Sequence, residues 1–379
     1  MPSPGPPSGP ARLAAIDGLR LSAALMVAAY HFLGTPTSHF WGRTELRDLV
    51  PFLHEISRYG WLGVEFFFAI SGFVICMSCW GRTPGQFTVS RIARLFPAYW
   101  CAVLLVVALV LVSRMGHWPA ATRVDFRTVL GNLTMAPGPL GLDLVDGVSW
   151  TLWVEARFYL LMAVLLVRGL SYRRVVTFCG AWLLAGVITL ELHSPLLEEF
   201  VLPRYTGLFV AGIVLHLMHR FGRSLLLWLL LGFAWSYELT VLELRVADHA
   251  TVPTGESRPS WAVCAVVLTV CLGLLALAGV DGPLARLRRR WLVTAGGLTY
   301  PFYLLHQSVG VPLAKGLLRL VPKLGPLPSM AVSVLCVLGL SLLIHTTVER
   351  RLGRLLRHRL TLDMRVRDPA VRPAVIRTP

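Results

Sequence analysis

Apolar blocks of about twenty residues recur along this 379-residue chain and leave few folds open to it. At a rise of 1.5 Å per residue, a helix of that length spans the roughly 30 Å hydrocarbon core of a bilayer. Hydrophobic residues make up 55% of the chain and charged residues 15%, whereas about a quarter of a typical soluble domain is charged. We therefore predict an all-α, polytopic integral membrane protein, and exclude a soluble enzyme, a disordered chain and a disulfide scaffold.

Ten of these blocks are predicted to be transmembrane helices. They cover residues 13–33, 59–79, 96–114, 148–167, 175–191, 204–218, 224–242, 261–280, 291–313 and 328–348. A segment rich in Pro, Gly and Ser, residues 1–12, is predicted to be a disordered N-terminal tail. The membrane domain then covers residues 13–350, and residues 351–379 form a basic C-terminal tail.

The distribution of arginine predicts the orientation of these helices. Arginine is concentrated in alternate loops and in the C-terminal tail, namely residues 80–95, 168–174, 219–223, 281–290 and 351–379. Because basic loops stay on the cytoplasmic side, both termini are predicted to be cytoplasmic. The loop with Lys315, Arg319 and Lys323 departs from this pattern. The net charge of 36 − 20 = +16 thus reflects membrane orientation, and no nucleic-acid partner is predicted.

The seven cysteines all lie inside or at the ends of apolar blocks. In such surroundings Cys behaves as a small hydrophobic residue. Cys76 and Cys79 form a single C-x-x-C pair without a second one, so neither a metal site nor a redox site is predicted.

Ionisable side chains inside spanning helices are costly, and they usually face a cavity or a partner. Five motifs in this chain carry such residues. They are Asp17-Gly18-Leu19-Arg20 with His31 eleven residues after the arginine, Glu65-Phe66-Phe67 leading to Ser71-Gly72-Phe73, Arg91-x-x-Arg94-x-x-Pro97, Ser149-Trp150-x-Leu152-x-x-Glu155-x-x-Phe158-Tyr159, and Tyr300-x-x-Tyr303-Leu304-x-His306.

Helical rise converts these positions into depths in the membrane. Eleven residues separate Arg20 from His31, which is roughly 16 Å along one helix. With the predicted orientation, the histidines and glutamates fall in the outer half, and the arginines collect at the cytoplasmic mouth. Guanidinium groups there suit an anionic, phosphate-bearing molecule. A histidine near carboxylates suits general-base work on a hydroxyl.

Taken in order, the five motifs resemble the membrane acyltransferase-3 family of bacterial O-acyltransferases, over nearly the whole chain. This resemblance implies transfer of an acyl group, typically from acyl-CoA, to a hydroxyl on a sugar, a lipid-linked glycan or a small natural product. By resemblance, His31 matches the essential histidine of helix one and Arg20 its arginine. Arg91 and Arg94 match the R-x-x-R pair, and Glu65 stands where the family often has Asp.

The predicted site follows from these assignments. His31 is predicted to be catalytic, assisted by Glu65 or Glu155, and Arg20, Arg91 and Arg94 are predicted to bind acyl-CoA. Substrate contacts or structural roles are predicted for Asp17, Ser71, Trp150, Tyr303 and His306.

Each residue also has an ordinary structural alternative. His31 can bond a carbonyl of a neighbouring helix, and Glu65 and Glu155 can pair with arginines to hold helices together. Arg91 and Arg94 can serve as topology determinants only. The Ser71-Gly72 pair can simply permit close helix approach, and a nucleophilic serine at this position is disfavoured.

The function expected from the sequence is therefore a membrane O-acyltransferase in the bacterial inner (plasma) membrane. Its expected partners are acyl-CoA, a hydroxyl-bearing acceptor and the lipid bilayer, and the acyl group is expected to be acetyl or another short chain. Antibiotic tailoring (a macrolide, for example) and polysaccharide modification both fit. A transporter or flippase, with the same charges forming a proton relay, is the alternative; we find no repeated halves that would favour it. A sensor or envelope-complex partner is a third reading.

Overall fold

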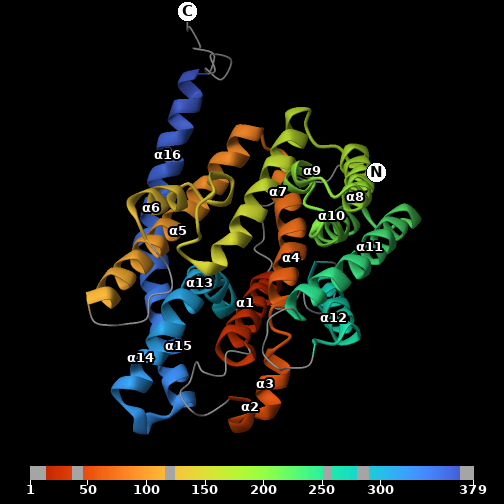
Figure 1. Cartoon of the computed structure of the whole chain (residues 1–379). Coiled ribbons are helices and arrows are strands. Elements are labelled where there is room, and N and C mark those ends of the chain that lie inside the picture. Colours follow the sequence, from red (N-terminus) through yellow and green to blue (C-terminus); the bar gives the residue numbers. More distant parts are fainter. Residues whose placement is uncertain (1–13, 36–45, 116–123, 251–257, 280–289, 368–379) are drawn as a thin grey trace, which may run out of the picture. The chain divides into compact units, whose positions relative to one another are not determined.

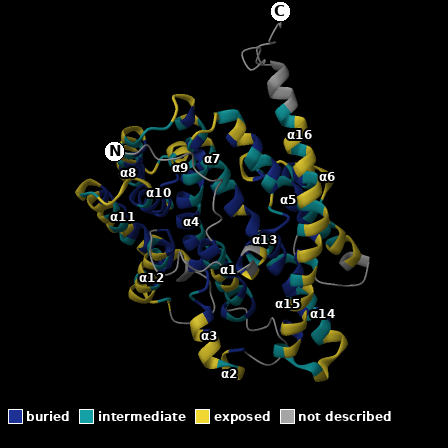
Figure 2. Ribbon diagram, turned by 180° about the vertical axis from the view of Figure 1, so that it is seen from behind, coloured by how far each residue is buried: buried dark blue, intermediate teal, exposed yellow. Residues whose placement is uncertain are grey.

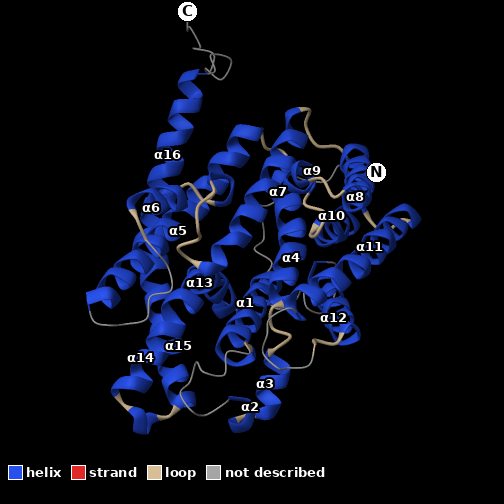
Figure 3. Ribbon diagram, viewed as in Figure 1, coloured by secondary structure: helices blue, strands red, loops and turns tan. Residues whose placement is uncertain are grey.

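The computed structural model describes residues 14–35, 46–115, 124–250, 258–279 and 290–367 (Figure 1). Within these ranges the regular secondary structure is helical, without strands (Figure 3). The chain divides into two compact units, each built from separate stretches of sequence. The first comprises Met1–Val74 and Val176–Thr299, and the second comprises Ile75–Val175 and Tyr300–Pro379.

Nine helical stretches in the described ranges are long and apolar enough to cross a membrane. They coincide with nine of the ten predicted segments, which confirms an all-α, polytopic membrane protein. The exception is the predicted span 291–313. It is helical in the structure, but it contains an internal proline, Pro301, and a π-helical turn, His306–Gly310. Its polar motif residues, Gln307 and His306 among them, make it too polar to count as an ordinary apolar span.

The first unit contains most of the N-terminal helices and a central group of helices. Its elements are α1 (Ala14–Ala29), the π-helical turn η1 (Tyr30–Gly34), α2 (Leu46–Leu49), α3 (Pro51–Ser57), α4 (Leu62–Cys79, up to Val74), α8 (Tyr172–Leu192, from Val176), α9 (Pro195–Val201), α10 (Thr206–Phe221), α11 (Leu225–Ala250), α12 (Trp261–Gly279) and α13 (Arg290–Leu305, up to Thr299).

Helix α10 is the central element of the first unit. Every residue from Thr206 to Met218 is buried, as expected for a helix that is apolar on all sides (Figure 2). Glycines bring α4 and α10 into close contact. A Cβ at Gly72 would meet the Phe209 carbonyl, and one at Gly212 would meet the Ala69 carbonyl. The Ser71-Gly72 pair therefore serves close helix approach, the structural alternative considered above.

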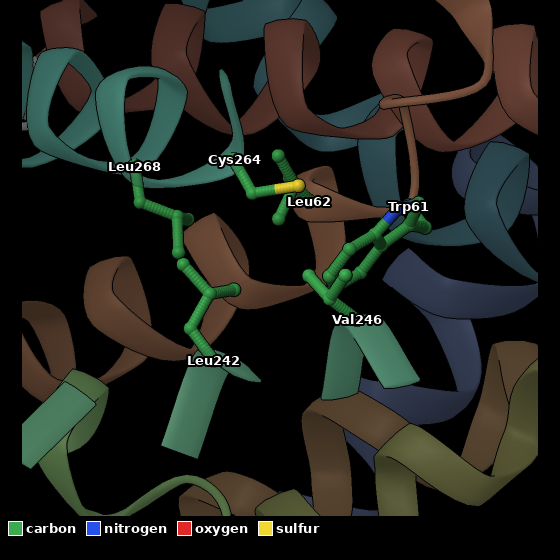
Figure 4. Close-up of a cluster of buried hydrophobic side chains, with 6 residues drawn as sticks. All are labelled: Trp61, Leu62, Leu242, Val246, Cys264 and Leu268. Carbon is green, nitrogen blue, oxygen red and sulfur yellow. The ribbon is translucent and has the colours of Figure 1, made fainter. Parts of the chain in front are cut away.

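A hydrophobic cluster joins α4, α11 and α12 in the same unit (Figure 4). Its buried members are Trp61, Leu62, Leu242, Val246, Cys264 and Leu268. Cys264 is a free thiol packed among apolar side chains. It therefore plays the hydrophobic role that the sequence predicts for the cysteines.

The second unit contains the motif helices with the paired arginines. Its elements are the end of α4, α5 (Pro84–Met115), α6 (Phe126–Leu133), η3 (Gly138–Leu140), η4 (Gly147–Ser149), α7 (Trp150–Val167), the start of α8, the end of α13, η6 (His306–Gly310), α14 (Val311–Leu320), η7 (Pro322–Leu324), α15 (Pro326–Leu343), η8 (Ile344–Glu349) and α16 (Arg350–Arg367).

Helix α16 lies in the segment that the sequence analysis treats as a C-terminal tail. The predicted N-terminal tail, residues 1–12, falls outside the described residues, whereas α16 continues α15 through η8 as far as Arg367. Its buried Gly353 faces the Ala93 carbonyl of α5, so the helix packs closely beside the R-x-x-R segment. The arginines of α16 are largely exposed (Figure 2).

Candidate active site

His31 lies in the π-helical turn that ends α1. Such turns are rare and often mark functional sites. The ring is half-buried and meets Tyr30 edge-on, with 5.2 Å between ring centroids. The turn is anchored from α3, because His54 Nδ1 donates to the Leu33 carbonyl oxygen over 2.7 Å and Gly34 packs against the Ser57 backbone. The backbone that follows the predicted catalytic histidine is thus held in place.

Glu65 belongs to a buried ionic network in the first unit. It is 3% exposed and pairs with Arg245 of α11, with 3.4 Å between Oε2 and Nη1. Arg245 also pairs with the buried Glu238 and donates to the Arg204 carbonyl. One guanidinium therefore serves two carboxylates. The ion pair considered above as the alternative for Glu65 is present, and its catalytic role stays a prediction.

Arg245→Met is expected to lower the free energy of unfolding by about 3–5 kcal/mol, because it leaves two buried carboxylates without their counter-charge. The measurement is an SDS or thermal unfolding series on the purified protein. The control is Asp248→Asn, which breaks the exposed Arg204–Asp248 pair, whose side chains are 46% and 57% exposed. That change is expected to cost about 0–1 kcal/mol. Equal effects of the two variants would show that Arg245 does not hold the network together.

Asp17 and Arg20 lie three residues apart on α1, and both are half-buried. The Asp17 side chain packs against Gly296 of α13, where a Cβ would meet its carboxyl carbon. A glycine at position 296 therefore makes room for this carboxylate. Asp17, Arg20 and Ser71 all take part in polar or electrostatic interactions.

The paired arginines lie in the second unit, on α5. The Arg91 guanidinium lies 5.8 Å from the Phe87 ring centroid and 6.0 Å from that of Tyr159. Its electrostatic neighbours include Arg94 and Glu155. The sequence analysis placed Glu155 at a different depth from the arginines, but the structure puts it beside them. Because Glu155 and Tyr159 are one helical turn apart on α7, they present one face to the pair.

Helices α7 and α13 contribute a ladder of polar contacts that runs away from the arginines. Nearest them, Tyr300 donates to the Leu95 carbonyl oxygen over 3.1 Å. The Tyr303 hydroxyl lies 3.0 Å from Thr151 Oγ1. Farther along, Ser308 of η6 donates to Asp146, just before η4. From Tyr300 to Ser308, the partner thus changes from α5 to the start of α7 and then to the residue before η4.

His306 is fully buried at the start of η6. Its Nδ1 lies 2.6 Å from the Tyr303 carbonyl oxygen, which can only accept, so Nδ1 carries the proton. In the neutral ring, Nε2 is then the basic nitrogen. Trp150 opens α7 and is 38% exposed, which fits an interfacial anchor.

Three residues of these clusters escape the motif-based prediction. Glu238 is an ionisable residue inside a predicted span, so the criterion that selects Glu65 selects it as well. Arg245 follows it after two helical turns, at the interval that places both on one face. Asp146 precedes the Ser149-Trp150 motif in a segment predicted to be a loop. In the described part of the chain, no group of three or more His, Cys, Asp or Glu side chains gathers as a metal site would require.

The sequence matches the model of a protein family described as an acyltransferase domain, over residues 13–346. The chain belongs to this acyltransferase family, as its motifs indicate. It is thus a multi-pass membrane enzyme that transfers acyl groups other than aminoacyl groups.

Three relatives illustrate the range of this similarity. The chain is 28% identical to acyltransferase MdmB of Streptomyces mycarofaciens over 378 residues, covering 92% of this chain and 93% of the relative. It is 26% identical to nodulation protein 10 of Rhizobium leguminosarum bv. viciae, covering 78% and 83%. Protein 2 in the picA locus of Rhizobium radiobacter is 32% identical over 148 residues, which cover 37% of this chain and 65% of the relative. No solved structure matches this chain.

Proposed function

We propose that this acyltransferase takes an acetyl or other short acyl group from acyl-CoA and transfers it to a hydroxyl of a sugar, a glycan or a natural product such as a macrolide. It does so in the bacterial plasma membrane. The observation that carries the proposal is the Arg91–Arg94 pair on α5, set among Phe87, Tyr159 and Glu155. Arginines bind phosphate through charge-assisted hydrogen bonds, and CoA is rich in phosphate.

The paired arginines bind the phosphates of the donor, and Arg20 supplies further positive charge. The rings beside Arg91 restrict its guanidinium to one region, which lowers the entropy lost on binding. Glu155, an electrostatic neighbour of Arg91, weakens the repulsion between the two arginines. These roles need no metal ion.

His31 acts as the general base. Its imidazole removes the proton from the acceptor hydroxyl as the oxygen attacks the thioester carbonyl. The carbon–sulfur bond then breaks, the CoA thiolate leaves and takes up a proton, and an ester remains on the acceptor. Glu65, which pairs with Arg245 in the same unit, assists His31 in this step. In the first unit, Asp17 and Ser71 are assigned substrate contacts or structural support. In the second unit, Trp150, Tyr303 and His306 are assigned the same roles.

Proteoliposomes containing the purified protein test the proposal against the transporter alternative. Labelled acetyl-CoA is added with a panel of acceptors that includes a sugar, a polysaccharide and a macrolide. We expect acylated acceptor and free CoA in equal amounts. Uptake of unmodified acceptor without any need for acetyl-CoA would instead identify a transporter.

A further inference from the structure

Asp146, in the second unit, is a buried carboxyl that the motifs leave without a role. The Asp146 side chain belongs to a residue that is only 1% exposed. One carboxyl oxygen, Oδ1, accepts a hydrogen bond from Ser308 Oγ. The other, Oδ2, is buried and has no hydrogen-bond partner among the residues that the structure describes. An unsatisfied buried acceptor costs free energy, so its retention calls for a reason.

The position of Asp146 is built by several hydrogen bonds to the loop around it. Its carbonyl oxygen accepts from Ser149 N over 3.1 Å and from Ser149 Oγ over 2.7 Å. Upstream, Asn132 Nδ2 donates to the Asp143 carbonyl oxygen over 2.8 Å, and its Oδ1 accepts from Val145 N over 3.0 Å. The carboxyl is therefore fixed in place before any ligand arrives.

Asn132 is itself tied to α5, because Tyr99 Oη donates to its carbonyl oxygen over 2.7 Å. The same Tyr99 is an electrostatic neighbour of Asp146. Opposite, η6 carries Ser308, which donates to the Asp146 carboxyl. The titratable group that the structure places near Asp146 is Tyr99 from α5.

Asp146 and Ser308 both offer hydrogen-bond acceptors to a ligand. Asp146 Oδ2 can accept a hydrogen bond. The Ser308 hydroxyl donates its hydrogen bond to Asp146, so the lone pairs on its oxygen can only accept hydrogen bonds from a ligand. Two neighbouring acceptors without protons of their own match a ligand that presents two neighbouring O–H donors.

We propose that Asp146 and Ser308 form a subsite that binds a vicinal diol of the hydroxyl-bearing acceptor. This inference rests on the proposed function and names the chemical class of the acceptor. Asp146 lies nine residues before Glu155 and outside the N-terminal end of α7, so the subsite is set apart from the arginines that hold the donor. Acceptor binding and donor binding thus use different ends of the α7–α13 ladder.

Burial raises the pKa of Asp146 to about 7, because desolvation outweighs the bonds from Ser308 and the Val148 backbone. The carboxyl is protonated below that pH and ionised above it. A protonated carboxyl accepts hydrogen bonds less well, so the KM for the acceptor should rise as the pH falls below about 7. Asp146→Asn removes the titrating group, and this pH dependence should disappear with it.

The experiment measures acetyl transfer from acetyl-CoA to octyl β-glucoside, a vicinal diol, and to a monodeoxy analogue that lacks one of the paired hydroxyls. In the wild type, the analogue is expected to have a KM roughly 10-fold higher. Asp146→Asn should raise the KM for octyl β-glucoside by about 10- to 100-fold and remove the preference for the diol. Ser308→Ala, a smaller perturbation, should also raise the KM for octyl β-glucoside.

The KM for acetyl-CoA distinguishes a failure of this subsite from a failure of the proposed acyl transfer. The KM for acetyl-CoA should be unchanged in both variants. Unchanged acceptor KM values in Asp146→Asn and Ser308→Ala, with normal transfer, would overturn the subsite alone. Failure of the wild type to acylate any hydroxyl from acetyl-CoA would overturn the proposed function instead.

Discussion

His31→Ala is expected to lower kcat for acyl transfer by about 10²- to 10⁴-fold, the usual contribution of a positioned general base. The KM for acyl-CoA should change little, because His31 is not proposed to touch the donor phosphates. The measurement is steady-state transfer of labelled acetyl from acetyl-CoA in nanodiscs. His358→Ala, at an exposed position on α16, is the matched control and should retain full activity.

A pH profile adds a second readout for the same residue. If His31 is the base, the remaining activity of His31→Ala should lose the limb of the wild-type profile that reports its deprotonation. Transfer at the wild-type rate in His31→Ala would remove this histidine from the mechanism. His306, whose Nε2 is the basic nitrogen of the neutral ring, would then be the candidate general base.

Arg91→Ala combined with Arg94→Ala is expected to raise the KM for acetyl-CoA by about 10- to 100-fold for each arginine, the loss expected for a hydrogen bond between charged groups. The donor analogue acetyl-pantetheine, which lacks the nucleotide phosphates, isolates the cause. Wild type and variant should use this analogue with similar KM values. Arg223→Ala, an exposed arginine in another basic loop, controls for changes in topology and should behave as wild type.

An equal loss with acetyl-CoA and acetyl-pantetheine would contradict phosphate binding by this pair. It would leave Arg91 and Arg94 with a structural role, holding Glu155 and Tyr159 of α7 in place. A changed insertion of the protein, detected by cysteine labelling of the loops, would point to the topology role instead. Donor dependence thus separates phosphate binding from a structural role, and cysteine labelling identifies a topology role.

The membrane fold is largely predictable from the sequence, because length and hydropathy are local properties. Nine predicted spans recur as long apolar helices in the described residues. The tenth segment shows the limit of this argument. Tyr300, Tyr303 and His306 make α13 and η6 polar, and they do so because they face other polar groups inside the protein rather than lipid. Polarity there reports a buried site, which a hydropathy pattern cannot distinguish from a short or absent span.

The site is predictable only in part. Arg91 and Arg94 are recognisable by their spacing. The structure adds Phe87, one helical turn before Arg91, and Tyr159 of α7, which is distant in the sequence. Glu65 is found by its place in a motif, but its partner Arg245 comes from a helix nearly 180 residues later. Asp146 follows from no local pattern, because its burial depends on Asn132, Tyr99 and Ser308, three residues far apart along the chain. Contacts of this kind are properties of packing, not of periodicity.

The central claim is that a guanidinium-bound acyl-CoA donates its acyl group to a hydroxyl with His31 as the base. The most direct measurement is a single-turnover reaction of the purified protein in nanodiscs with isotope-labelled acetyl-CoA and a hydroxyl acceptor, followed by mass spectrometry of both products. The account predicts labelled acetyl ester and free CoA in equal amounts in the wild type, and the same products formed about 10²- to 10⁴-fold more slowly in His31→Ala. Ester formed at the same rate in the two proteins, or no labelled ester from any hydroxyl acceptor while the protein remains folded, would contradict it.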